Sequence, residues 1–161
     1  VLAQAVDAVR GLAGERDIEI SLGEVPRRME VLGNRQQLLV ALRSIVDNAV
    51  RYSEAGTTVE VSARTDGRAV EIAVRDHGIG IAPSETERVF ERFYRLDEAR
   101  ARHQAGTGIG LSLARHVASS HGGEIALESA PGAGTTCTLR LPAGPSPVAL
   151  VDGGAAQDLA G

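Results

Sequence analysis

Lysine and tryptophan are missing from this chain of 161 residues, and all 17 of its basic residues are arginine. A phosphate-binding P-loop needs its lysine, and protein kinases of the eukaryotic type need a lysine on a strand. The absence of lysine therefore excludes both classes. The chain has one cysteine, Cys137, so it forms no internal disulfide and no metal site built from several cysteines. We expect Cys137 to lie in the core, because it falls within an alternating strand pattern.

Long hydrophobic runs and excess positive charge are also lacking. No apolar stretch approaches the ~20 residues of a membrane-spanning helix, and the formal net charge is −4. We therefore expect no nucleic acid partner and no membrane contact by this domain. The length is typical of one domain with a real core.

Aromatic residues are scarce, which makes their positions informative. The chain has two tyrosines and two phenylalanines, so the core must be built from aliphatic side chains. Three of the four aromatics, Phe90, Phe93 and Tyr94, fall in one short polar stretch. We infer that this stretch has a role beyond filling volume.

Hydrophobic periodicity predicts an alternation of helices and strands. Helices are expected over 2–13 (ended by Gly14), 34–52 (capped by Asn34) and 109–121. Strands are expected over 18–22, 29–32, 59–63, 70–74, 125–128 and 136–141. Turn signals at 66–67 and 131–134 make two hairpins. The sum is an α/β sandwich of two layers, with a mostly antiparallel sheet of about five strands and helices on one face.

Two glycine-rich stretches stand out against this background. The first is Asp76-His77-Gly78-Ile79-Gly80, and the second is Gly106-Thr107-Gly108-Ile109-Gly110-Leu111, which runs into a helix. Glycines at a helix start favour an anion such as phosphate, although a flexible loop before a helix gives the same pattern. Residues 82–105 between them are polar and aperiodic apart from a short helical piece at 85–90, which favours a functional lid.

Individual polar residues support a nucleotide site without requiring one. A buried Asp76 could accept a hydrogen bond from an exocyclic amine, or could simply form a turn before glycine. Asn48 is a candidate Mg²⁺ ligand or a helix-surface residue, and Arg51 shares its face. Tyr52 either stacks on a base or covers the core edge. The arginines that flank Phe93-Tyr94 suit phosphate or a docking surface.

Taken together, the motifs resemble the catalytic, ATP-binding domain of histidine kinases. Residues 38–53 resemble its N box, 76–80 its first glycine box, 89–95 its F box and 106–111 its second glycine box. The segments 122–125 and 134–136 match as well, and all blocks occur in the family's order. The resemblance covers residues 1–142, with a lid at 82–107, and leaves 143–161 as a tail that we expect to be disordered.

The resemblance implies the Bergerat fold, with ATP and Mg²⁺ as cofactors. Asp76 would hold the adenine amino group, Asn48 would bind Mg²⁺, Arg51 would contact phosphate and Tyr52 would lie against the base. Phe90 and Phe93 would anchor the lid, with Arg92 or Arg95 near the phosphates. The remaining residues that the resemblance assigns to cofactor binding are Gly78, Gly80, Ile81, Gly106, Thr107, Gly108, Gly110, Leu111 and Thr135.

Two departures from the family refine the expected activity. Ser44 stands four residues before Asn48, where hydrolysing relatives carry a glutamate base, so ATP hydrolysis is disfavoured. None of the four histidines has the context of a phosphoacceptor. The resemblance then implies transfer to a histidine on a separate dimerisation domain, and a response regulator as partner of the full-length kinase. It implies a cytoplasmic domain of a membrane-anchored sensor. A serine kinase of the anti-sigma type and a non-catalytic nucleotide-binding module of the same fold remain alternatives.

Overall fold

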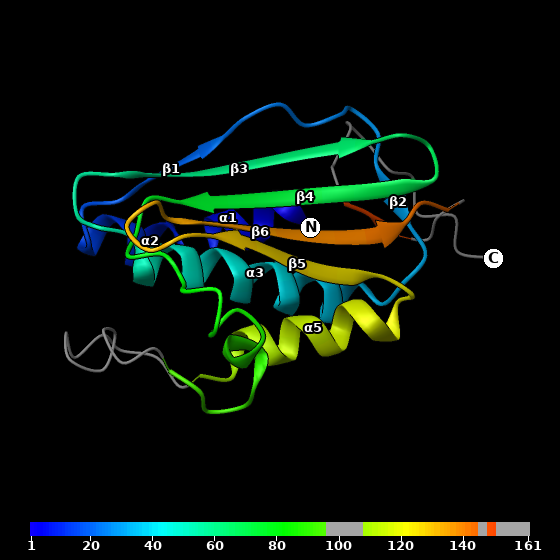
Figure 1. Ribbon diagram of the computed structural model, residues 1–161. Coiled ribbons are helices and arrows are strands. Elements are labelled where there is room, and N and C mark those ends of the chain that lie inside the picture. Colours follow the sequence, from blue (N-terminus) through cyan, green and yellow to red (C-terminus); the bar gives the residue numbers. More distant parts are fainter. Residues whose placement is uncertain (96–107, 145–147, 151–161) are drawn as a thin grey trace.

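The fold is a two-layer sandwich of one sheet and one layer of helices, as the computed structural model shows (Figure 1). The structure describes residues 1–95, 108–144 and 148–150. The central sheet has five strands in the order β1-β3-β4-β6-β5. β1 (Glu19–Leu22) and β3 (Thr58–Thr65) are parallel, while β4 (Ala69–Asp76), β6 (Thr135–Pro142) and β5 (Glu124–Ser129) continue the sheet in antiparallel pairs. The predicted fold class and both predicted hairpins are confirmed.

Two long helices carry most of the second layer. α3 (Arg35–Tyr52) begins where predicted, because Asn34 Oδ1 accepts a hydrogen bond from Gln37 N–H at 3.0 Å. α5 (Gly110–Ser120) packs against α3. The backbone N–H of Asn34 donates to His121 Nε2 at 3.0 Å, so the start of α3 is tied to the end of α5. This contact gives His121 a structural role.

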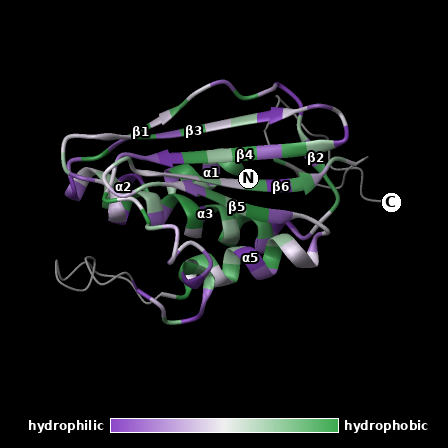
Figure 2. Cartoon of the chain, in the orientation of Figure 1, coloured by the Kyte–Doolittle hydropathy of each residue, from purple (hydrophilic) through white to green (hydrophobic). Residues whose placement is uncertain are grey.

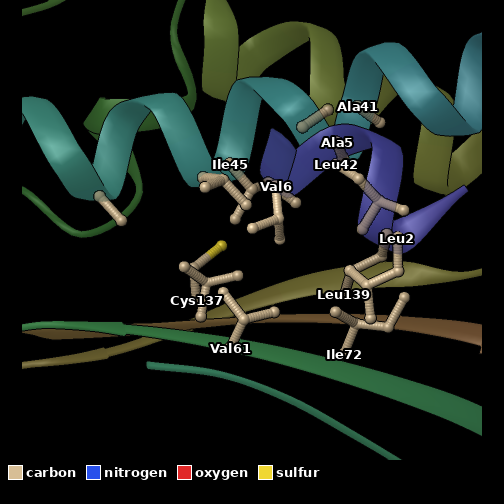
Figure 3. Packing of buried hydrophobic residues seen from close by; sticks show 14 of the residues in the cluster. Leu2, Ala5, Val6, Ala41, Leu42, Ile45, Val61, Ile72, Cys137 and Leu139 are labelled. Carbon is tan, nitrogen blue, oxygen red and sulfur yellow. The ribbon is translucent and has the colours of Figure 1, made fainter. Parts of the chain in front are cut away.

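The core lies between the two layers and is aliphatic, as the lack of aromatics predicts. Leu2, Val6, Leu42 and Ile45 lie between the helices and Val61, Ile72, Cys137 and Leu139 of the sheet, and Ala5 and Ala41 belong to the same buried cluster (Figure 3). Burial alternates along β3, so only one face of this strand is covered. Hydrophobic residues are frequent in the central strands and in α3, which border the core (Figure 2). Cys137 is buried, which confirms its predicted place.

The first helix differs from the prediction. The structure divides it into α1 (Leu2–Asp7) and α2 (Arg10–Glu15), because the N–H of Val9 bonds to the carbonyl of Val6 three residues back. Gly14 does not end α2. The left-handed turn is made by Asp17, which has φ 57°, and it leads the chain directly into β1. The regular apolar spacing of residues 2–13 gave no sign of this break.

The expected disordered tail is wrong for the part of it that the structure describes at residues 148–150. β7 (Val148–Ala149) pairs with β2 (Glu30–Val31) in a second, two-stranded sheet. Leu150 is fully buried beside these strands. The sequence did not indicate this pairing, because a strand of two residues is too short to show a periodic pattern. The segments 145–147 and 151–161 lie outside the described residues.

Candidate functional site

A pocket of about 660 Å³ opens between α3, the end of the sheet and the start of α5. This volume lies in the range of small-molecule sites. Its walls include ten of the residues that the sequence assigned to cofactor binding: Asn48, Arg51, Tyr52, Asp76, Gly80, Ile81, Gly108, Gly110, Leu111 and Thr135. Apolar side chains such as Val74, Ile79 and Leu127 complete the lining. The pocket thus combines an apolar floor with a few polar groups.

Asp76 is the buried carboxylate of this pocket, with 5% of its surface exposed. Its Oδ1 atom accepts two backbone N–H bonds, from Gly78 at 3.0 Å and from Thr135 at 3.2 Å. Within the described residues no hydrogen bond engages Oδ2. The loop after β4 and the first residue of β6 therefore fix the carboxylate and leave one oxygen for a donor on a ligand.

Burial raises the pKa of Asp76 to about 6, and the two N–H bonds and nearby His77 only partly oppose this effect. The group is still mainly ionised at neutral pH. An ionised, desolvated oxygen with an unused lone pair binds an N–H donor strongly. The geometry and the pKa both make this oxygen a candidate acceptor for a donor on a ligand.

Asn48, Arg51 and Asp47 are among the polar residues that α3 contributes to the pocket wall. The side chain of Asn48 forms no hydrogen bond within the described residues, so its amide oxygen is available. Arg51, about one turn later, donates from Nε to Asp47 Oδ2 at 2.6 Å. Both members of this ion pair are about 30% exposed, so a bound anion can reach the guanidinium. Asp47 was not among the predicted site residues.

Tyr52 lies between two arginines at the end of α3. Burial raises the pKa of its hydroxyl, and Arg95 and Arg51 lower it in part. Arg95 also donates a hydrogen bond to the tyrosine side chain. This contact connects the segment after Phe93 and Tyr94 to α3, although the two lie far apart in the sequence.

Aromatic contacts anchor residues 82–95, the described part of the predicted lid. Phe90, in the short helix η1 (Arg88–Phe90), is buried, and Arg115 of α5 stacks over its ring at 4.7 Å. The Tyr94 hydroxyl donates to Glu85 Oε1 at 2.6 Å, and this tyrosine lines the pocket. The predicted anchoring role of Phe90 agrees with this arrangement.

Phe93 does not take the predicted place. Its side chain is 62% exposed, and it does not line the pocket. Its φ is 66°, and its N–H donates to the carbonyl of Gly108 at 2.9 Å. This left-handed turn directs Tyr94 inward in place of Phe93. Arg92 stacks over the exposed Phe93 ring at 5.6 Å, so it too lies outside the pocket wall.

Gly78 is required by a close backbone approach. A Cβ at this position would lie 1.9 Å from the carbonyl oxygen of Tyr52, which no side chain allows. Gly78 is not part of the pocket lining, but its N–H holds Asp76 and it pairs with Ser53. The first glycine stretch thus serves the site by joining the end of β4 to the end of α3.

Gly108 has a similar role at the second stretch, with φ 71° and the backbone of Phe93 and Tyr94 in contact. The adjacent predicted residues Gly106 and Thr107 lie outside the described residues.

Metal binding by the protein alone has little support within the described ranges. They contain no group of three or more histidine, cysteine, aspartate or glutamate residues that could hold an ion. The amide of Asn48 fits a hard cation that is bound through this one protein ligand and the oxygens of a bound molecule, which is the usual arrangement for Mg²⁺ with phosphates.

None of the helices in the described ranges has the length and apolar character of a membrane span.

Comparison with known proteins decides the family. The model of the histidine kinase-, DNA gyrase B- and HSP90-like ATPases matches residues 33–145. The chain belongs to this ATPase family. Sensor-like histidine kinase SenX3 of Mycobacterium tuberculosis is 46% identical over 143 residues, which cover 89% of this chain. Sensor histidine kinase WalK of Bacillus subtilis is 37% identical over 130 residues, or 80% of this chain.

Solved structures of the ATPase family have the same fold. The mycobacterial sensor histidine kinase MprB is 30% identical, with a TM-score of 0.76 over 89% of this chain and 93% of its own. Full-length ShkA in complex with AMPPNP is 29% identical, with a TM-score of 0.76 over 88% of this chain. The chain spans about a third of the length of SenX3, 35%, and 21% of WalK. The relatives therefore carry further domains.

Two residues at or beside the pocket were missed by sequence reasoning. Asp47 and Ser129 had no motif of their own, although Asp47 adjoins the recognised Asn48. Ser129 became visible only when β5 was placed beside β6. No local signal could have found it.

Proposed function

We propose that this chain is the ATP-binding catalytic domain of a sensor histidine kinase. The observation that carries the proposal is the buried Asp76 carboxylate in the pocket wall, with one oxygen held by two N–H groups and the other without a hydrogen bond among the described residues. An adenine amino group is the matching donor. The named relatives are sensor histidine kinases, which favours this reading over an anti-sigma serine kinase.

The phosphates of ATP would lie along α3 and toward the second glycine stretch. Arg51 would exchange part of its ion pair with Asp47 for phosphate oxygens, and Arg95 would approach from the lid side of Tyr52. Mg²⁺, held by Asn48 and phosphate oxygens, would neutralise charge on the transferred group. Arg92 is directed away in this structure and is a weaker candidate.

The phosphoryl acceptor would be a histidine on a separate dimerisation domain of the same parent protein. A neutral imidazole nitrogen is already nucleophilic, so the domain needs to supply only positioning and charge neutralisation. Ser44 lines the pocket where a base for water would stand, and a hydroxyl cannot serve as one. ATP hydrolysis is therefore the weaker alternative. A response regulator would receive the phosphoryl group from the full-length kinase, a membrane-anchored sensor with this domain in the cytoplasm.

The test has two stages, beginning with calorimetric titration of ATP in the presence and absence of Mg²⁺. We expect saturable binding that Mg²⁺ strengthens, and its loss in Asp76→Ala. The control is Asp7→Asn, which removes an exposed carboxylate on α1. Unchanged affinity in Asp76→Ala would remove this residue from the site.

The second stage supplies the phosphoacceptor domain of the parent protein together with ATP labelled at the γ-phosphate. Label should appear on its histidine in an acid-labile form. A chain that binds ATP but never labels the acceptor domain would be a non-catalytic nucleotide-binding module.

A further inference from the structure

Ser129 occupies one end of a row of three side chains across the sheet. Thr135 of β6 pairs directly with Asp76 of β4 on one side and with Ser129 of β5 on the other. Residues directly opposite one another in neighbouring strands point to the same face. Asp76 and Thr135 line the pocket, whereas Ser129 does not.

The hydroxyl of Ser129 makes three hydrogen bonds. Its oxygen accepts from the N–H of Ile81 at 2.8 Å, and its hydrogen is donated to the carbonyl of Gly134 at 2.9 Å. The third contact joins its oxygen to the hydroxyl oxygen of Thr135 at 2.7 Å. A serine hydroxyl has one hydrogen and two acceptor positions, so these three contacts use its full capacity.

This saturation determines the direction of the Thr135 hydroxyl. A carbonyl oxygen can only accept, so the one hydrogen of Ser129 is committed to Gly134. The hydrogen in the contact between the two hydroxyls must then come from Thr135. With that hydrogen directed away from the pocket, Thr135 presents only acceptor lone pairs to a ligand.

We propose that Ser129 is a positioning residue for base specificity, because it orients Thr135 as an acceptor beside the acceptor Asp76. Two adjacent acceptors match the 6-amino group of adenine, directly or through a water. They oppose a 6-oxo purine, whose oxygen is itself an acceptor. The inference rests on the proposed nucleotide function and assigns to it a residue that does not line the pocket.

The experiment compares the affinities of ATP and ITP, because hypoxanthine replaces the 6-amino group by an oxo group without adding a 2-amino group. In Ser129→Ala the Thr135 hydroxyl loses its acceptor and becomes able to donate to the oxo group. We expect the preference for ATP over ITP to fall about 3- to 10-fold, the value of one hydrogen bond. The backbone groups freed by the substitution affect both nucleotides alike and cancel in the ratio.

Two further variants test whether Ser129 acts through Thr135. Ser129→Thr retains a hydroxyl and should keep the wild-type ratio. Thr135→Val removes the acceptor, and adding Ser129→Ala to it should change the ratio no further. An unchanged ratio in folded Ser129→Ala, or a further fall in the double variant, would overturn the proposal.

If Ser129→Ala does not fold, the Thr135→Val variant decides alone. An ATP-to-ITP ratio that this variant leaves unchanged also overturns the proposal, because Ser129 is argued to act only through that hydroxyl. These failures are distinct from failure of the proposed function, in which the wild-type chain binds neither nucleotide.

Discussion

The carbonyl oxygen of Leu150 accepts a hydrogen bond from the backbone N–H of Leu2 at 3.0 Å, so two segments at opposite ends of the sequence are joined. Leu150 also donates its own N–H to the carbonyl of Met29 at 3.0 Å. All three side chains are buried. The C-terminal segment is therefore part of the core, although the family match ends at residue 145.

Leu150→Ala should destabilise the domain by about 2–5 kcal/mol, because it leaves a cavity among buried side chains. The measurement is urea unfolding followed by circular dichroism. Leu32→Ala is the control, since Leu32 is 67% exposed and its loss should change the free energy of unfolding by less than about 0.5 kcal/mol. Equal effects of the two substitutions would show that residue 150 does not pack in the core in solution.

Stability should fall as the pH rises through the range in which Asp76 titrates. The pKa of this carboxyl is raised from 3.8 to about 6 in the folded domain, chiefly by burial. Between these values the folded state binds more protons than the unfolded state, so the free energy of unfolding decreases with pH. The decrease should reach up to about 3 kcal/mol and level off above pH about 6.

The comparison for this pH effect is Asp76→Asn, which has no carboxyl group to titrate. The free energies of unfolding of the two proteins should diverge between pH 4 and 6 and run parallel above. Curves that stay parallel over the whole range would mean that the carboxyl is not desolvated as the structure shows.

Arg51→Met should weaken the binding of ATP and ADP about tenfold or more while leaving adenosine affinity unchanged. A charge-assisted hydrogen bond to a phosphate is worth about 1.5–3 kcal/mol, and adenosine has no phosphate to lose. Calorimetric titration with the three ligands measures the effect. Arg64→Met, which removes an exposed arginine paired with Glu71 on the hairpin, is the matched control. A similar loss of adenosine affinity would place Arg51 in a structural role.

Gly78→Ala should both destabilise the domain and reduce ATP affinity. The added Cβ would meet the Tyr52 carbonyl at 1.9 Å, and relieving that clash must move the N–H that holds Asp76. We expect a loss of about 2 kcal/mol or more in the free energy of unfolding. Gly11→Ala, in α2 with open space around it, should instead be neutral or stabilising by up to about 1 kcal/mol. Tolerance of alanine at position 78 would contradict the close approach of the two segments.

The features that could be predicted from the sequence are local. Asn34 caps α3 through a bond to a residue three positions away, and the hairpins follow from alternation on either side of a turn. Such features depend on neighbours in the chain, so their spacing is readable. The glycine stretches and the positions of Asp76 and Asn48 were readable for the same reason, because motifs keep these residues at short intervals.

The features that became known only from the folded structure involve partners far apart in the chain. The N–H of Thr135 reaches Asp76 across 59 positions, and Ser129 orients Thr135 only because β5 and β6 are in one register. The exchange of Phe93 for Tyr94 at the pocket followed from one left-handed turn against Gly108. Hydrogen-bond direction and side-chain orientation depend on groups that the fold brings together, and no local pattern encodes them.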